Sequence, residues 1–143
     1  MLLNLPTAAD LENGFGDDPK ICADTILLAA DTGVAGGSIE DATGKPQSPI
    51  YPFELAVERV KAAVQASKSL DRSFTLTARA EGMIYGNPDL KEVIKRLVAF
   101  ADTGADVLFA PGLKTPDEII AVVKAVSPKH VSVMQGMAGV HFP

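Results

Sequence analysis

The sequence lacks the features on which disulfide-linked, membrane-spanning and nucleic-acid-binding proteins depend. A single cysteine, Cys22, excludes internal disulfides and cysteine-rich metal sites and agrees with a reducing compartment. No apolar run approaches the length of a membrane span, and the first ten residues lack the basic and apolar segments of a secretion signal. The 13 Lys and Arg residues are outnumbered by 18 Asp and Glu residues and form no basic stretch. We therefore expect a cytoplasmic protein that binds neither membranes nor nucleic acid.

The apolar content is sufficient for one domain, because 47% of the 143 residues are hydrophobic, which excludes wholesale disorder. Apolar periodicity predicts four helices, at residues 18–32, 52–70, 88–103 and 115–127. Three of these helices open with a capping residue followed by proline, and the capping residues are Asp18, Asn87 and Thr115. Short stretches rich in β-forming residues predict five strands, at residues 3–9, 34–39, 74–78, 107–110 and 131–134.

The strict alternation of strands and helices predicts a parallel sheet with right-handed crossovers. The tetrapeptide Ala-Asp-Thr-Gly at residues 30–33 recurs at residues 101–104, a distance of two βα units of about 35 residues each, as in a (β/α) barrel. Turn chemistry common to any α/β protein is the alternative explanation. We predict the fold class α/β, as a partial TIM (β/α) barrel of about five parallel strands and four helices.

Acidic residues follow the first two predicted strands. Parallel α/β folds bind ligands at the carboxyl ends of their strands, where Asp10, Glu12, Glu40 and Asp41 are expected to meet. So many carboxylates at one rim repel one another unless a cation neutralises them. With only oxygen ligands, Mg²⁺ or Mn²⁺ is favoured over zinc. We expect Asp10, Glu12 and Glu40 to be metal ligands, and the alternative is a set of solvated loop acids and helix caps.

Other candidate residues surround this rim. Arg79 follows the third strand, and its guanidinium can hold a carboxylate or phosphonate of a substrate by two bonds. Gly36 and Gly37 let the backbone approach a ligand closely, although a tight turn explains them equally well. The polar segment 42–51 is either a lid that brings Lys45 to the substrate or an ordinary surface connection. We expect Arg79 and Lys45 to be catalytic, and Arg79, Gly36 and Gly37 to bind substrate.

Four blocks of sequence, in their order and spacing, resemble the isocitrate lyase/phosphoenolpyruvate mutase superfamily. The blocks are ADLENGFGDDP at 9–19, GVAGGSIEDATG at 33–44, LTARAEG at 76–82 and AFADTGADVLFAPG at 99–112. The resemblance implies a Mg²⁺-dependent enzyme of the lyase, hydrolase or mutase type. Such an enzyme forms or cleaves a C–C or P–C bond of a small 2-oxo or phosphono carboxylate through an enolate.

The resemblance also implies roles for individual residues. Asp10 matches the aspartate that binds the metal directly, whereas Glu12 and Glu40 match acids that hold metal-bound waters. Arg79 matches the arginine that binds the substrate carboxylate, and residues 43–51 match the gating loop. That loop lacks the Lys-Lys-Cys-Gly-His signature of the isocitrate and methylisocitrate lyases, so the cysteine that serves them as general acid is missing.

The family pattern extends beyond both ends of this sequence. We therefore expect residues 1–143 to form a single incomplete (β/α) barrel domain that lacks the N-terminal and C-terminal barrel units. An open parallel sheet leaves two unpaired edges, so we also expect a homo-oligomer. The alternative to the enzyme is a catalytically inactive barrel fragment that acts as an oligomerising or binding module.

Overall fold

Strands and helices alternate throughout the computed structural model, which describes residues 5–85 and 88–134. The strands in those residues are β1 (Ala8–Asp10), β2 (Gly36–Glu40), β3 (Thr75–Arg79), β4 (Val107–Phe109) and β5 (His130–Ser132). The helices are α1 (Pro19–Asp31), α2 (Phe53–Lys68), α3 (Leu90–Thr103) and α4 (Pro116–Val126). The prediction of five strands and four helices is therefore confirmed.

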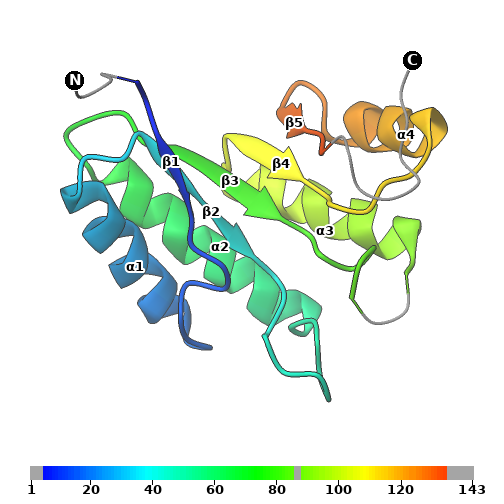
Figure 1. The fold of residues 1–143 in the computed structure, drawn as a ribbon, viewed down its shortest axis with the longest axis horizontal. Coiled ribbons are helices and arrows are strands. Elements are labelled where there is room, and N and C mark those ends of the chain that lie inside the picture. The colour runs from blue at the N-terminus through cyan, green and yellow to red at the C-terminus, as the bar shows by residue number, and fades with distance from the viewer. Residues whose placement is uncertain (1–4, 86–87, 135–143) are drawn as a thin grey trace.

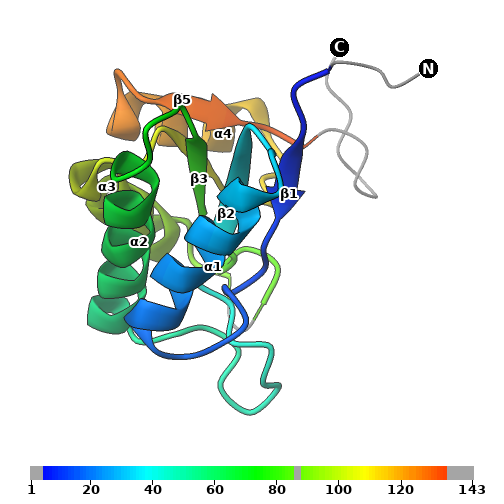
Figure 2. The same cartoon turned by 90° about the vertical axis from the view of Figure 1, so that its left-hand side faces the viewer.

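The five strands form one parallel sheet in the order β1-β2-β3-β4-β5. This order has no reversal, so successive right-handed crossovers place the helices on the same face of the sheet. Figures 1 and 2 show α1, α2 and α3 packed behind one face, and no helix among the described residues lies over the other face. The arrangement is that of a partial (β/α) barrel, and the described strands do not close into a complete one.

Local capping chemistry fixes most helix starts. Asp18 accepts a hydrogen bond from the backbone of α1, and Thr115 forms a reciprocal capping box with Glu118 at the start of α4. The predicted start of the third helix is wrong, because Asp89 caps α3 by accepting hydrogen bonds from two backbone N–H groups. Asn87, the predicted cap, lies outside the described residues. A carboxylate two residues further along is thus the functional cap.

The first strand begins later than predicted. The apolar stretch 3–9 suggested pairing from its start, but β1 comprises only Ala8–Asp10. Residues 1–4 lie outside the described part, and Pro6 has no N–H group for a ladder hydrogen bond. Asp10 is consequently the last residue of β1 rather than a residue that follows it.

Successive strand residues point to opposite faces of the sheet. Ile39, Leu76, Ala78 and Leu108 are buried against the helices, and Cys22 of α1 is fully buried in the same core. The other set of strand residues forms what we call the open face, which includes Ala8, Asp10, Ser38, Glu40, Thr75, Thr77 and Arg79. These seven residues are exposed or partly exposed, whereas Gly36 and Phe109 of the same set are buried. Most of the hydrophobic core therefore lies between the sheet and its helices.

No helix in residues 5–85 and 88–134 is both long enough and apolar enough to cross a membrane.

Candidate active site

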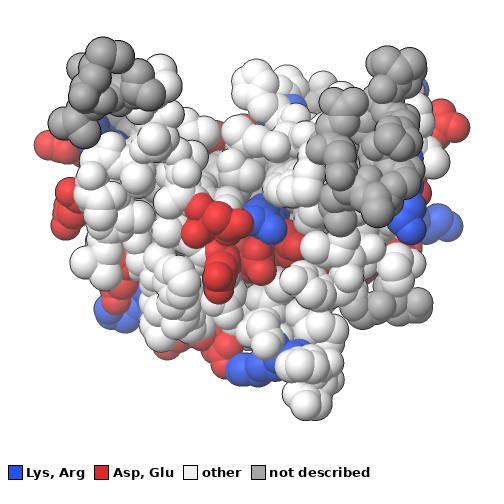
Figure 3. Space-filling view, in the orientation of Figure 1, with Lys and Arg blue, Asp and Glu red and all other residues white. Residues whose placement is uncertain are grey.

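The carboxyl ends of β1, β2 and β3 bring most of the predicted site residues together. Glu40 and Arg79 are in register on neighbouring strands, and Asp10 ends β1 beside them. A cavity of about 720 Å³ opens at this end and is bordered by Asp10, Glu12, Glu40, Lys45 and Arg79, among other residues. Figure 3 shows the acidic side chains gathered against a basic one near the middle of the open face.

Arg79 lies among the acids rather than beside them. Its Nη1 is 2.6 Å from an oxygen of Asp10, its Nη2 is 3.2 Å from Glu40, and its Nε is 2.8 Å from Glu81. Glu81 is almost fully buried and was not predicted as a site residue. Its position two residues after Arg79 could have revealed it, because side chains at this spacing in extended backbone share a face. The guanidinium thus supplies part of the positive charge that the acids require.

The acids nevertheless carry more charge than one guanidinium neutralises. Burial, followed by the charge of Glu81, raises the pKa of Glu40 to about 7, although Arg79 opposes the shift. Burial likewise raises the pKa of Glu81 in spite of its bond to Arg79. For Asp10, burial is outweighed by the backbone N–H of Glu12 and by Arg79, so its pKa is lowered. Asp10 is therefore the acid of this cluster most firmly held in the ionised state.

The donor set suits a hydrated hard cation. Within residues 5–85 and 88–134, no three Asp, Glu, His or Cys side chains converge closely enough to hold a metal by themselves. Mg²⁺ usually keeps several waters and takes one or two carboxylates directly, and the Asp10 side chain is 60% exposed at the cavity. Glu12 and Glu40 border the same space. Burial is the main cause of the raised pKa of Glu40, and the charges of Glu81, Asp10 and Glu12 add to it; a cation in this space would oppose both causes.

Asp41 does not belong to the rim, contrary to the prediction. It is 1% exposed and accepts hydrogen bonds from the backbone N–H of Glu81, at 2.8 Å, and from Nη1 of Arg96, at 3.1 Å. Arg96 also donates to the carbonyl oxygen of Tyr51 and to the carboxylate of Glu92. Asp41 thus ties the segment after β3 to α3. The pattern Glu40-Asp41 alone does not indicate which of the two acids points inward.

Segment 42–51 is closed at its base by a bridge between Ala42 and Ile50, and it projects beyond the carboxyl end of β2 (Figure 1). Lys45 borders the cavity, but its ammonium group is 2.5 Å from Asp17 of the β1–α1 loop. The hydroxyl of Tyr51 also donates to Asp17, at 2.7 Å. Asn13 of the same loop donates to the carbonyl oxygen of Thr43 and to the hydroxyl of Tyr51, so several bonds attach the segment to the β1–α1 loop.

Gly36 and Gly37 do not join the other candidates. They lie at the amino end of β2 and are buried, whereas the cavity opens at the carboxyl end. A Cβ on Gly36 would lie 2.4 Å from the carbonyl oxygen of Thr75, and one on Gly37 would lie 2.8 Å from the side chain of Leu11. Close packing against neighbouring residues accounts for both glycines without a substrate.

Comparisons with known proteins complete this description. The family model described as phosphoenolpyruvate phosphomutase matches residues 1–142. A 2-methylisocitrate lyase of Salmonella typhimurium (strain LT2) is 33% identical over 111 residues, which cover 73% of this chain and 36% of the enzyme. A solved structure from Burkholderia cenocepacia J2315, described as a candidate lyase/mutase, is 54% identical with a TM-score of 0.86 and covers 93% of this chain and 49% of that one.

A structure of phosphonopyruvate hydrolase in complex with oxalate and Mg²⁺ is also similar. It is 30% identical with a TM-score of 0.76, and the match covers 90% of this chain and 45% of that one. The chain therefore spans half or less of the length of each of these three relatives.

Proposed function

Since this chain belongs to the phosphoenolpyruvate phosphomutase family, within the isocitrate lyase/PEP mutase superfamily of lyases, mutases and hydrolases, we propose that its site acts on a small 2-oxo or phosphono carboxylate. The reaction forms or cleaves a C–C or P–C bond next to that carboxylate through an enolate, with Mg²⁺ (or Mn²⁺) as cofactor. The protein acts in the cytoplasm. The observation that carries this proposal is the placement of Arg79 and the acids Asp10, Glu12 and Glu40 on one cavity.

Arg79 is the residue that binds the substrate anion. Its Nε and Nη2 are held by the well-buried side chains of Glu81 and Glu40, whereas Nη1 is held by the exposed carboxylate of Asp10. A substrate carboxylate that approaches from the cavity displaces Asp10 from Nη1 and forms a charge-assisted hydrogen bond in its place. Asp10 then becomes free to serve as a ligand.

Asp10 would hold the metal directly, and Glu12 and Glu40 would hold waters around it. When bound, Mg²⁺ supplies positive charge that stabilises the negative charge developing on the enolate oxygen. Lys45 reaches the substrate when its ammonium leaves Asp17, because both partners of that ion pair are more than half exposed and such pairs are worth only about 0–1 kcal/mol.

Calorimetry with oxalate, which mimics an enolate, tests this function. We expect heat from oxalate only when Mg²⁺ is present, and we expect Asp10→Asn to abolish it. Asp24→Asn is the matched control, because Asp24 is also exposed but pairs with Lys20 on α1. Absence of Mg²⁺-dependent oxalate binding by the unaltered chain would remove the proposed site. Equal binding by Asp10→Asn and Asp24→Asn would remove Asp10 from it.

The two sheet edges favour a second candidate function, that of an inactive barrel fragment that acts as an oligomerising or binding module. Among the described strands, β1 and β5 each pair on one side only, and a strand edge is a template for pairing with another chain. Homo-oligomerisation through these edges is compatible with either function. Sedimentation equilibrium separates the possibilities: dimers without oxalate binding support the module, and a monomer that melts cooperatively contradicts it.

A further inference from the structure

The cavity at the candidate active site has two chemically different walls. Arg79 and the acids form one wall, and the other includes Pro46, Pro49, Ile84 and Tyr85. Ile84 is 39% exposed and Tyr85 is 47% exposed. Large apolar side chains that line the same cavity as fixed charges are typical of a binding site that recognises an apolar group on its ligand.

The size of the cavity exceeds what a minimal substrate fills. A three-carbon 2-oxo acid has six non-hydrogen atoms and occupies about 180 Å³, at the roughly 30 Å³ that one water molecule takes in the liquid. The cavity holds about 720 Å³. Most of its apolar wall would therefore stay in contact with water if the substrate were this small. Binding would then leave the exposed surface of Ile84 and Tyr85 unburied.

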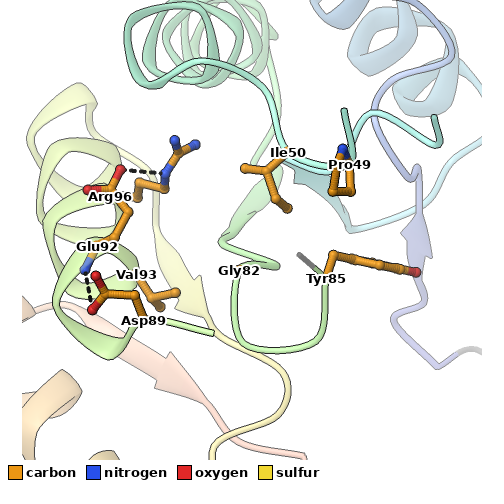
Figure 4. Close-up of a pocket in the computed structure, with 8 residues that line it drawn as sticks. All are labelled: Pro49, Ile50, Gly82, Tyr85, Asp89, Glu92, Val93 and Arg96. Atoms are coloured by element: carbon orange, nitrogen blue, oxygen red, sulfur yellow. Dashed lines mark hydrogen bonds and ion pairs between the residues drawn. The ribbon is translucent and has the colours of Figure 1, made fainter. Parts of the chain in front are cut away.

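A second cavity of about 240 Å³ lies next to the apolar wall, because Pro49 and Tyr85 line both cavities. Figure 4 shows Pro49, Ile50 and Tyr85 on one side of it and Val93 of α3 on the other. Two acids, Asp89 and Glu92, also line this cavity. They disfavour an anionic group there.

Arg96 and Lys95 both form ion pairs with Glu92, whereas the Asp89 carboxylate accepts hydrogen bonds from backbone N–H groups of α3. Although Arg96 lines the second cavity, it already donates to Asp41, to Glu92 and to the carbonyl oxygen of Tyr51. A second carboxylate on a ligand would therefore meet the Asp89 carboxylate and two cations that already have partners. An uncharged group is the kind that these walls accept.

We propose that the substrate is a 2-oxo acid with an uncharged aliphatic substituent of three or four carbons, which packs against Pro49, Ile84 and Tyr85. This inference rests on the function proposed above. It makes Ile84 and Tyr85 specificity-determining residues, and it excludes substrates whose substituent ends in a second carboxylate.

N-substituted oxamates test the inference, because they keep the two chelating oxygens of a 2-oxo acid and vary only the substituent. Burial of one methylene strengthens binding by about fourfold at most. We therefore expect N-isobutyl oxamate to bind at least tenfold more tightly than oxamate, with Mg²⁺ present, in the unaltered chain. N-carboxymethyl oxamate should bind more weakly than the isobutyl compound.

Variants test which side chains cause the preference for the alkyl substituent. Ile84→Ala and Tyr85→Ala should each reduce the preference for N-isobutyl oxamate over oxamate to below threefold. Ile120→Ala, at an exposed isoleucine of α4, should leave that preference intact. Oxalate binding without any alkyl preference, or with tighter binding of N-carboxymethyl oxamate, would overturn this inference and leave the proposed function standing. Loss of Mg²⁺-dependent oxalate binding itself would overturn both.

Discussion

Arg59 offers the sharpest test of how the site is held together. The side chain is fully buried in α2, and its Nη1 donates to the carbonyl oxygens of Gly16 and Asp17, each at 2.6 Å, while Nη2 donates to the carbonyl oxygen of Asn13. The guanidinium also lies over the ring of Tyr51, 4.1 Å from its centroid. One cation thereby fixes the loop between β1 and α1. We therefore consider the substitution Arg59→Met, which keeps an unbranched apolar stem and removes the guanidinium donors.

The expected cost follows from the three carbonyl groups that lose their donor. A buried polar group left without a partner costs about 1–3 kcal/mol. Burial of the apolar methionine side chain offsets about 1.5–3 kcal/mol of this cost. The desolvation penalty of the guanidinium is also removed. We expect a net loss of about 3 kcal/mol in the free energy of unfolding, by these magnitudes. For a domain of this size, that loss corresponds to a fall of about 10 °C in Tm.

Urea denaturation followed by circular dichroism measures this loss. Lys61→Met is the matched control, because Lys61 lies on the same helix, is 50% exposed and pairs only with Glu58 at 3.6 Å; exposed pairs of this kind contribute about 0–1 kcal/mol. Arg59→Lys should be intermediate, since an ammonium keeps the charge but lacks the planar fork. If Arg59→Met were as stable as Lys61→Met, the loop would not depend on the guanidinium and the reasoning would fail.

Two further predictions concern the sheet. Because the pKa of Glu40 rises from 4.5 to about 7 on folding, the folded chain retains a proton that the unfolded chain has lost, so the Glu40 contribution to stability falls as pH rises between these values. Urea unfolding with a chelator present should therefore show that the free energy of unfolding of Glu40→Gln rises relative to that of the unaltered chain between about pH 5 and about pH 8. A difference that does not change with pH would contradict the raised pKa of Glu40. Gly36→Ala should lower stability by about 1–3 kcal/mol through overpacking, since its Cβ meets the backbone oxygen of Thr75. Gly82→Ala, where the nearest atom is a side-chain methyl at 3.0 Å, should cost less stability, and urea unfolding of the two variants measures the difference.

The helices were predictable because their signals are local. Asp18 and Thr115 cap α1 and α4 as the sequence indicates, since a capping side chain acts on backbone groups only two or three residues away. Strand boundaries depend on the partner strand instead. The stretch 3–9 is apolar, yet the ladder of β1 starts where its residues meet those of β2, at Ala8. Sequence periodicity carries no information about where a neighbouring strand begins.

The position of the site in the fold was predictable from the sequence, whereas the contacts between its side chains and distant helices were not. Asp10, Glu40 and Arg79 were placed correctly at one end of the sheet because each ends a parallel strand. The burial of Asp41 could not be predicted, because it depends on Arg96 of α3, which lies 55 residues away in the sequence. The metal, the roles of Lys45 and the assignment of residues 1–143 to a single incomplete domain stay predictions.

The residues on the two faces of the sheet are subject to different packing restrictions. Leu76 and Ala78 fit a packed core, so a change in their volume leaves a void or a clash. Ser38 and Thr77 face away from the helices and are only partly covered, so their replacement opens no cavity in that core. Substitutions at Ser38 and Thr77 can therefore change the open face without disturbing that core. The surface beside the reacting groups can vary at these two positions, while packing restricts the residues beneath it.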